Sequence, residues 1–360
     1  MDSRLKTRLG SLELKNPVIC GSGEATMTEA GIRAAIRAGA GAVMPKSVNE
    51  SPKARKQLDH TDYMLLDNRW KPIEWTTSPP ADAQLFCRSG LNQVDFDEWL
   101  EKLVRLDKEA QAVGSYVVGH LILADTTQCV RMAQRMEEAG LRVITVLVSA
   151  VHGAQASKDA IAVVSDPSEV KEIVRTLRQA LKIPLWIKLP GHDVAALARA
   201  ARDGGADAVN FIDRSLAMVP DLSTRAPYLG TVGAIGGSWA LPLACRWIAE
   251  TRLKVSRDLP IIGCNGARDG YDVARMILAG ARAVEMTSAV MLSGTNVIRK
   301  SIDELDGYLH EQDCTVTDIV GEAADKLTAY TDQASLPGRW KEFVHPEALD
   351  PDSPHVPQEK

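Results

Sequence analysis

The stretch Leu278-Ala-Gly-Ala-Arg-Ala-Val-Glu-Met286 carries the pattern that indicates the fold class, because a helix ending in Ala-Gly is followed at once by a short apolar run. A glycine at that point suits the left-handed end of a helix, and the run after it suits a strand buried on both faces. The same pattern recurs at residues 37–45, 138–146 and 203–211. Repeated exits from helix to strand indicate parallel βα units, not a sandwich or a helical bundle.

Eight apolar runs along the chain have the length and composition of strands. They lie at about 17–22, 41–46, 116–122, 143–149, 185–189, 208–212, 260–264 and 283–287. Helical stretches separate them. One begins at Asp166-Pro-Ser-Glu169, which combines an N-cap, a proline at the first helical position and a glutamate at the third. Eight alternations of strand and helix predict the α/β class and a (β/α)8 TIM barrel.

A single barrel over residues 1–336 accounts for most of the 360-residue chain. The segment at about 49–92 is too long for a simple connection, so we expect an insertion there, either a lid or an interface element. It contains Trp70 and Trp75, which suit a partner surface, a cover over ligand or packing against the barrel. The tail over 337–360 is rich in proline and charge, and we expect it to be loosely ordered or to dock on a neighbour.

The composition is that of a globular chain, with 45% hydrophobic residues, 25% charged residues and a formal net charge of −5. So mild and mixed a charge argues against a nucleic-acid partner. The sequence has no run of about 18 apolar residues and no apolar signal core near its start, so we expect a cytoplasmic protein without a membrane partner. The six scattered cysteines include no C-x-x-C pair, which argues against zinc, thioredoxin-type and compact iron–sulfur sites and predicts no metal.

In a barrel of this kind, the chemistry gathers at the C-terminal ends of the strands. The sequence places lysines, glycines and hydroxyls there and few carboxylates, which favours an anion over a divalent metal. Ile261-Ile-Gly-Cys-Asn-Gly266 and Val284-Glu-Met-Thr-Ser288 end the last two strands, where barrels often bind phosphate. The glycine-rich loop over 233–242, just before a helix, favours a phosphate-bearing cofactor over glycines that merely permit tight turns.

Several short motifs, taken together, carry a family resemblance. They are Leu14-Lys-Asn-Pro-Val-Ile, Ser22-Gly23, Gly41-Ala-Val-Met-Pro-Lys-Ser47, Trp186-Ile-Lys-Leu-Pro190, Gly236-Gly237 with Ala240-Leu-Pro242, and the two phosphate-side motifs. In order and spacing, from about residue 4 to 330, they resemble the dihydroorotate dehydrogenase family of flavin barrels, of class 1 type, which includes the related domain of dihydropyrimidine dehydrogenase. The resemblance implies FMN at the barrel mouth, oxidoreductase activity on CH–CH bonds, and a possible homodimer.

The resemblance also implies which residues contact the cofactor. Lys188 matches the lysine that touches the pyrimidine edge of the flavin and stabilises the negative charge that develops there on reduction. Ser22, Lys46 and Ser47 match residues beside the isoalloxazine, while Gly237, Asn265, Gly266, Thr287 and Ser288 match the phosphate cradle; Gly23, Asn210 and Gly236 complete the implied contacts. Asn265 and Thr287 stand where the family has glycines, and both still leave hydrogen-bond donors.

The substrate side departs from the family. Its base loop has Asn and then Ser-Cys-Pro-Asn or Ser-Ser-Pro-Asn, whereas this chain has Leu147-Val-Ser-Ala-Val-His152. Ala150 stands where the base belongs, and a methyl group cannot take a proton. The asparagines that grip dihydroorotate match Leu147, Cys87, His152 and Asp213. Since a buried leucine cannot replace an amide, we expect a different small substrate, cyclic or amide-containing.

Two residues are candidates for the missing base. His152 either exchanges the substrate proton or is a hydrogen-bonded loop histidine, and Cys87 is either a thiol base or nucleophile or a packing residue. The favoured hypothesis is an FMN-dependent oxidoreductase that moves a hydride between its substrate and flavin N5. Without a cysteine cluster or a dinucleotide fingerprint, it requires an external electron acceptor or donor, a partner subunit or oxygen. The alternatives are a redox-inactive flavin barrel that serves as a partner or regulatory subunit, and a flavin-free barrel enzyme acting on a phosphorylated substrate.

Overall fold

The computed structural model describes residues 3–76, 78–80, 82–149, 161–212 and 215–349, and the chain divides into two compact units, Met1–Asp325 and Lys326–Lys360. The described part of the second unit contains three short 3-10 turns, η8 (Tyr330–Asp332), η9 (Arg339–Phe343) and η10 (Pro346–Ala348). The side chains of Tyr330, Trp340 and Phe343 are exposed there. The domain boundary expected at residue 336 stays a prediction.

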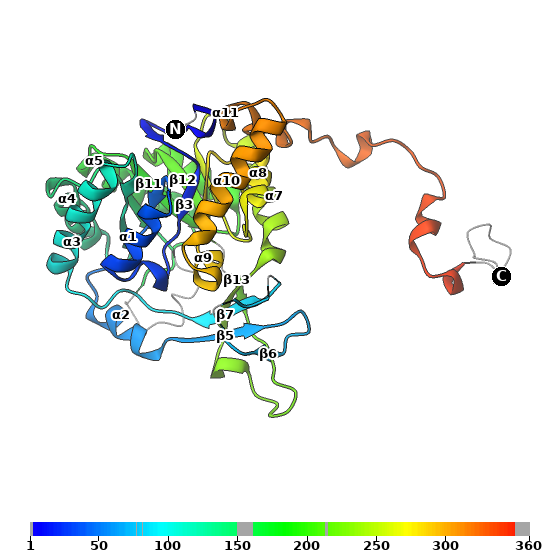
Figure 1. The fold of residues 1–360 in the computed structure, drawn as a ribbon, viewed down its shortest axis with the longest axis horizontal. Coiled ribbons are helices and arrows are strands. Elements are labelled where there is room, and N and C mark those ends of the chain that lie inside the picture. Colours follow the sequence, from blue (N-terminus) through cyan, green and yellow to red (C-terminus); the bar gives the residue numbers. More distant parts are fainter. Residues whose placement is uncertain (1–2, 77, 81, 150–160, 213–214, 350–360) are drawn as a thin grey trace. The chain divides into compact units, whose positions relative to one another are not determined.

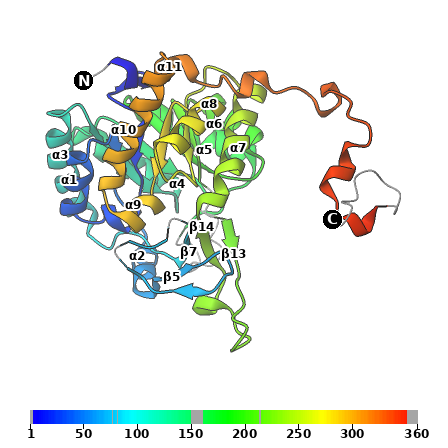
Figure 2. The same cartoon turned by 45° about the vertical axis from the view of Figure 1, so that its right-hand side comes forward.

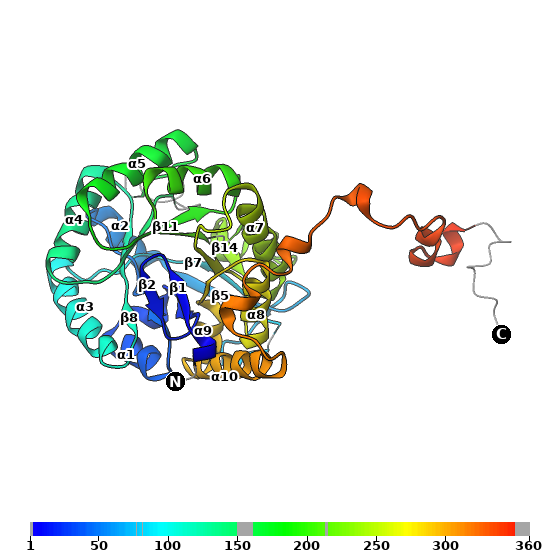
Figure 3. The same ribbon diagram turned by 90° about the horizontal axis from the view of Figure 1, so that it is seen from above.

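Parallel strands form the centre of the first unit (Figures 1 and 3). They are β3 (Val18–Cys20), β4 (Ala42–Val43), β8 (Tyr116–Val117), β9 (Gly119–Ile122), β10 (Ile144–Leu147), β11 (Leu185–Pro190), β12 (Ala208–Ile212), β15 (Ile261–Cys264) and β16 (Ala283–Met286). Their order is β8-β4-β3-β16-β15-β12-β11-β10-β9. The predicted (β/α)8 barrel is confirmed, with one strand interrupted.

Val118 explains why the sheet has nine strands although the sequence predicts eight. This single residue separates β8, which pairs with β4, from β9, which pairs with β10. Its N–H donates to the carbonyl of Val43 at 2.9 Å, and the next N–H, of Gly119, donates to Val143 at 3.0 Å. One continuous stretch therefore changes neighbours at Val118, and this change closes the ring.

Helices surround the strands, as the view in Figure 3 makes plain. They are α1 (Glu29–Arg37), α3 (Phe96–Gln111), α4 (Thr126–Glu138), α5 (Pro167–Ala180), α6 (Val194–Gly204), α7 (Leu241–Lys254), α8 (Gly270–Ala279) and α10 (Asn296–Glu311), with the shorter α2 (Pro52–Lys56), α9 (Ser288–Ser293) and α11 (Val316–Ile319). No helix within the described ranges is long and apolar enough to cross a bilayer.

The local signals in the sequence act as expected. The glycines of the four helix-to-strand exits, Gly39, Gly140, Gly205 and Gly280, have φ angles of +100°, +97°, +100° and +122°. Residues other than glycine rarely adopt such φ angles, so glycine is favoured at each of these four exits. At the predicted start of α5, the carboxylate of Asp166 accepts the N–H groups of Ser168 and Glu169 at 2.7 and 3.2 Å.

A hairpin of β1 (Thr7–Leu9) and β2 (Leu12–Leu14) covers one end of the barrel and is seen inside the ring in Figure 3. Its Leu9 and Leu14 join a buried apolar cluster that includes the strand residues Trp186, Ala208 and Ala283. This end of the barrel interior is therefore closed by packing and contributes to stability.

Alternation along the strands then brings polar groups into the next interior layer. Side chains two residues apart on a strand face the same side. Lys188 follows Trp186 in this way, and Glu285 follows Ala283; both polar side chains are buried. The interior changes from apolar to charged in one step toward the C-terminal ends of the strands, where the sequence predicts the site.

A second, antiparallel sheet lies at the end of the barrel opposite the β1–β2 hairpin (Figures 1 and 2). We call it the lid sheet. It consists of β5 (Asp62–Leu66), β6 (Pro72–Ile73), β7 (Gln84–Arg88), β13 (Ser215–Ala217) and β14 (Gly233–Gly236), in the order β13-β14-β7-β5-β6. The insertion at 49–92 thus joins the segment between β12 and α7 in one element, and it has a small core of its own made by Leu66, Phe86 and Ile235.

Candidate active site

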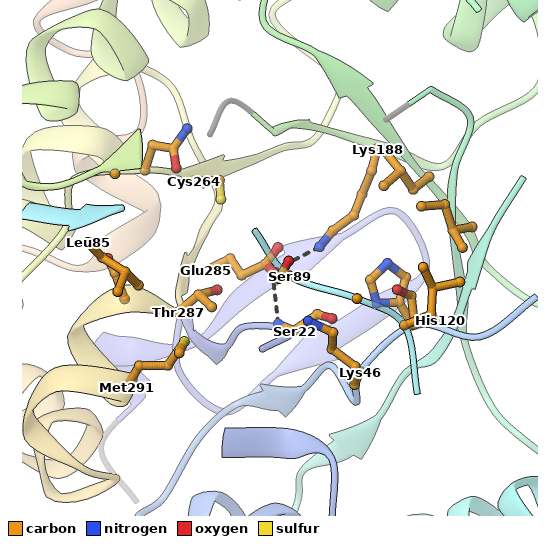
Figure 4. Close-up of a pocket in the computed structure, with 18 of the residues that line it drawn as sticks. Ser22, Lys46, Leu85, Ser89, His120, Lys188, Cys264, Glu285, Thr287 and Met291 are labelled. Atoms are coloured by element: carbon orange, nitrogen blue, oxygen red, sulfur yellow. Dashed lines mark hydrogen bonds and ion pairs between the residues drawn. The ribbon is translucent and has the colours of Figure 1, made fainter. Parts of the chain in front are cut away.

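A cavity of about 1150 Å³, measured out to its open mouth, lies where the polar ends of the barrel strands meet the lid sheet. The barrel lines it with Lys46, His120, Lys188 and Glu285, and strand β7 of the lid sheet lines it with Leu85 (Figure 4).

A buried carboxylate joins three parts of the chain at the cavity wall. Glu285, on β16, is 3% exposed, and its Oε1 accepts the ammonium of Lys188 at 2.8 Å and the N–H of Ser22 at 3.1 Å. Its Oε2 accepts the Nδ2 of Asn210 at 2.6 Å. Since Lys188 is itself only 2% exposed, the pair is a desolvated ion pair, and hydrogen bonds to the carboxylate are needed to make such a pair tolerable.

A second lysine is held close to the first. Lys46 is 4% exposed, and its Nζ lies 2.6 Å from Oε1 of Glu24, which is partly exposed at the start of the turn η2 (Glu24–Thr26). Both lysines of the cavity therefore have a carboxylate beside them. Figure 4 places Lys46, Lys188 and His120 around the same part of the cavity.

His120 on β9 lines this space and has a ring nitrogen without a hydrogen-bond partner among the described residues. The ring is 4% exposed, and its Nδ1 lies 3.1 Å from the carbonyl oxygen of Pro45, which can only accept, so Nδ1 carries the proton. Nε2 has no hydrogen-bond partner among the described residues. Burial, and then the charges of Lys188 and Lys46, hold the pKa of His120 well below its usual value. The ring is therefore neutral, with a lone pair on Nε2.

This depressed pKa predicts a loss of stability in acid. The unfolded chain takes up a proton on His120 below about pH 6.5 and the folded chain does not, so the free energy of unfolding falls as pH drops below that value. Relative to His120→Gln at equal FMN loading, we expect wild type to lose about 2 kcal/mol more between pH 7.5 and pH 5. Urea unfolding at both pH values measures it, with the exposed His345→Gln as the control; parallel pH profiles for wild type and His120→Gln would contradict the assignment.

Glycine-rich backbone forms the opposite part of the cavity. Asn265 and Gly266, after β15, have φ angles of +73° and +91°. A Cβ on Gly266 would lie 2.3 Å from the backbone nitrogen of Leu241, the first residue of α7. The loop therefore packs directly against the start of a helix, where the first N–H groups have no partner within the helix and favour an anion.

An apolar wall lies on another side of the cavity. Leu147, at the end of β10, lines it together with Leu91 and Ile122, and all three belong to one buried hydrophobic cluster. Leu147 occupies the position that the resemblance matches to a substrate-gripping asparagine. The structure thus presents a hydrocarbon surface there instead of an amide.

The structure brings together most of the cofactor residues expected from the sequence. Nine of them line the cavity, namely Ser22, Lys46, Ser47, Lys188, Gly236, Asn265, Gly266, Thr287 and Ser288. Asn210 lies behind the wall and acts through Glu285. Gly23 and Gly237 flank lining residues, and a Cβ on Gly237 would come within 1.9 Å of Oε1 of Gln84. His152, Ala150 and Asp213 lie outside the described residues.

Cys87 is buried near the end of β7. Leu85, two residues earlier on the strand, shares its face and lines the cavity, and Ser89, just beyond the strand, lines the cavity as well. The thiol therefore sits on the cavity side of the lid sheet, beneath the surface. Trp70 and Trp75, by contrast, are 49% and 46% exposed and are not among the described residues of the cavity wall.

Sequence reasoning missed Glu285 and His120. Both stand inside apolar strand runs, two residues after a residue of the buried interior cluster, Ala283 and Val118 respectively. A charged or imidazole side chain at an inward-facing position near a strand's C-terminal end is the signal that would have found them.

Together, the closed barrel, the buried lysine at its mouth and the glycine-rich backbone beside it define a TIM-barrel protein with a binding site at the C-terminal ends of its strands. The chain belongs to the dihydroorotate dehydrogenase family, whose model matches residues 77–309. It is 26% identical over 322 residues to a protein of Methanocaldococcus jannaschii, 28% over 327 to one of Methanocella arvoryzae and 25% over 323 to one of Thermoplasma acidophilum. Each comparison covers 89% of this chain and 98% of the relative, and each relative is named dihydroorotate dehydrogenase B (NAD(+)), catalytic subunit.

FMN is the cofactor of this family, and the residues present fit it. The loop at Gly266 leaves no room for a side chain on its inner face, and Gly236 borders open space, where a Cβ would meet no atom within 4 Å. Both features suit close approach of backbone N–H groups to a phosphate. Within the described ranges, no group of three or more His, Cys, Asp or Glu side chains is placed to hold a metal ion.

Proposed function

We propose that this enzyme oxidises or reduces a small cyclic or amide-containing molecule other than dihydroorotate. The observation that carries the proposal is Leu147, which lines the cavity within an apolar cluster where an amide is needed to grip dihydroorotate. A polar ligand group buried against hydrocarbon loses its hydrogen bonds to water without replacement, which costs about 1–3 kcal/mol for each group. A substrate with an apolar edge on that side avoids this cost.

We assign the cofactor contacts as follows. Bound FMN would supply N5 as the atom that accepts or gives the hydride. Lys188 holds a positive charge at the pyrimidine edge, and Ser22, Lys46 and Ser47 lie along the ring. Backbone and hydroxyl donors at Gly237, Asn265, Gly266, Thr287 and Ser288 hold the phosphate. The lining of one cavity by most of these residues supports the assignment.

The substrate proton has three candidate partners in this proposal. Cys87 lies on the cavity side of β7, and His152 follows the strand that ends at Leu147. His120 offers a hydrogen-bond acceptor at Nε2, and its low proton affinity suits it to orient a substrate N–H or O–H. We assign proton transfer to Cys87 or His152 and orientation to His120.

Cys87→Ala and His152→Ala test the proton step. Removal of the true acid or base lowers turnover by roughly 10²–10⁴-fold while FMN stays bound, because proton transfer contributes about that factor. Single-turnover flavin reduction measures it, and Cys314→Ala, at a partly exposed cysteine, is the control. If neither variant slows turnover beyond the control, both assignments are wrong.

The experiment that tests the proposed function is a visible spectrum of the purified protein before and after anaerobic dithionite, followed by titration with candidate substrates. We expect flavin bands that bleach with dithionite and with a cyclic amide, and no bleaching with dihydroorotate. Rapid bleaching by dihydroorotate would refute the proposal that the substrate is a different molecule. A flavin that no substrate bleaches, in a protein that binds another protein, would favour the redox-inactive partner subunit.

We further propose that an external carrier completes the cycle. The relatives are named as catalytic subunits, which supports a separate electron-carrying subunit, and a soluble acceptor or oxygen are the other sources. Reoxidation of the substrate-reduced protein by air, compared with reoxidation by added acceptors, distinguishes them. A homodimer, which the resemblance implies, is tested by the mass in solution.

A further inference from the structure

Glu285 is the one carboxylate among the described residues that ion-pairs with Lys188, and it is fixed from several sides. Lys188 Nζ lies 2.8 Å from one oxygen, and Asn210 Nδ2 lies 2.6 Å from the other. The N–H of Ser22 adds a contact at 3.1 Å. The carboxylate is 3% exposed and lines the cavity (Figure 4). Its charge is therefore held in place, with little water to screen it.

The charge of Glu285 opposes the role assigned to Lys188. A hydride brings two electrons and one proton to the flavin, so the cofactor gains one negative charge when the substrate gives up its hydride. A lone buried ammonium would stabilise that charge strongly. A carboxylate 2.8 Å from the same ammonium cancels much of its field and adds a repulsion of its own.

The charge of Glu285 also acts on a neighbouring thiol. Burial, and then the charge of Glu285, raise the pKa of the Cys20 thiol to about 12. Lys46, the other lysine among the described residues of the cavity wall, pairs with Glu24. His120 stays neutral beside them.

We propose that Glu285 sets the reduction potential of the bound flavin, by opposing the charge of Lys188 and so making the reduced flavin a stronger reductant. The inference rests on the proposed function, because it requires FMN with its pyrimidine edge at Lys188. Glu285 is a positioning residue in this role, since it acts through the lysine. The consequence for the reaction is that electrons leave the reduced flavin readily, for an acceptor or a substrate of low potential.

Glu285→Gln tests the proposal in the FMN-loaded protein. The amide keeps the shape of the side chain and can still accept from Lys188. Its NH₂ group can donate to Asn210 Oδ1, which has no hydrogen-bond partner among the described residues, once the Asn210 amide flips. The midpoint potential is measured by equilibration with a reference dye. We expect the equilibrium to move at least tenfold toward reduced flavin, which is about 30 mV for a two-electron couple.

Two further variants keep the test decisive. Glu109→Gln changes a carboxylate on α3, outside the cavity and paired with Arg33, and leaves the potential unchanged. Glu285→Met removes the charge without adding an amide, and it replaces Glu285→Gln if that variant does not hold FMN. An unchanged or lower potential in the flavin-loaded Glu285 variant overturns this inference alone. A wild-type chain that takes up no FMN overturns the proposed function and, with it, this inference.

Discussion

Lys188→Met is expected to reduce turnover by roughly 10²–10³-fold while the protein still binds FMN, because it removes the fixed positive charge from the point where negative charge develops. It also leaves Glu285 buried without its cation, at 3% exposure. Removal of one partner of a buried ion pair costs about 3–5 kcal/mol of stability. Steady-state kinetics on the flavin-loaded protein and urea unfolding measure the two effects.

The double variant Lys188→Met/Glu285→Gln separates catalysis from stability. With both charges removed, no uncompensated carboxylate remains, so we expect most of the lost stability to return. Turnover returns only in part, because the opposing carboxylate is gone but the ammonium is still missing. If Lys188→Met keeps turnover within a factor of about three of wild type, the assignment of Lys188 to the flavin is wrong. If the double variant is as unstable as the single one, the ion pair is not the cause of the loss.

Gly266→Ala is expected to abolish retention of FMN. The backbone φ there is +91°, and the new Cβ would lie 2.3 Å from the nitrogen of Leu241. The loop or the start of α7 must move to make room, and both are assigned to the phosphate cradle. We expect the dissociation constant for FMN to rise by at least about 100-fold, which corresponds to about 2.7 kcal/mol of binding free energy. Fluorescence titration of the apoprotein with FMN measures it.

Two other glycines are matched controls. Gly140→Ala imposes the same kind of backbone strain, at a φ of +97°, where a Cβ meets no atom within 4 Å. It lowers stability and leaves FMN affinity unchanged. Gly307, within α10, has an ordinary φ and open space around its Cβ position. Gly307→Ala therefore lowers neither stability nor FMN affinity. Weak FMN binding in Gly140→Ala would mean that the effect at Gly266 reflects general destabilisation.

The barrel was predictable because its signals are local. Each of the four repeated helix-to-strand exits carries a glycine at a positive φ, and the strands that follow are short apolar runs. The lid sheet was not predictable in the same way. Cys87 on β7 pairs with Ala234 on β14, far along the chain, and no local pattern specifies which strands of two separate insertions pair. The sequence therefore predicts an insertion at about 49–92, and the structure shows which strands this insertion pairs with.

The residues of the site differ in the same way in how well the sequence predicts them. Lys188 was expected because it stands in a recognisable motif at a strand end. Its partner Glu285 lies 97 residues away, and their contact depends on two strands facing one interior. Alternation along β16 gives the direction of Glu285, but its distance to Lys188 follows from how the ring closes. His152, one of the two candidates for proton transfer, lies outside the described residues, so its candidacy rests on the sequence.

Strand β14 belongs to two structures at once. Through Ala234 and Ile235 it pairs with β7 in the lid sheet, while Gly236, its last residue, borders the cavity just before the turn η6 (Ser238–Ala240) that leads into α7. The lid is consequently tethered to the cofactor site by continuous chain and is not a free flap on a hinge. We expect a motion that widens the mouth on this side also to displace Gly236, and so to link substrate admission to cofactor exchange. We expect a tightly loaded cofactor to stiffen the entrance, and a protein stripped of its cofactor to open more readily there.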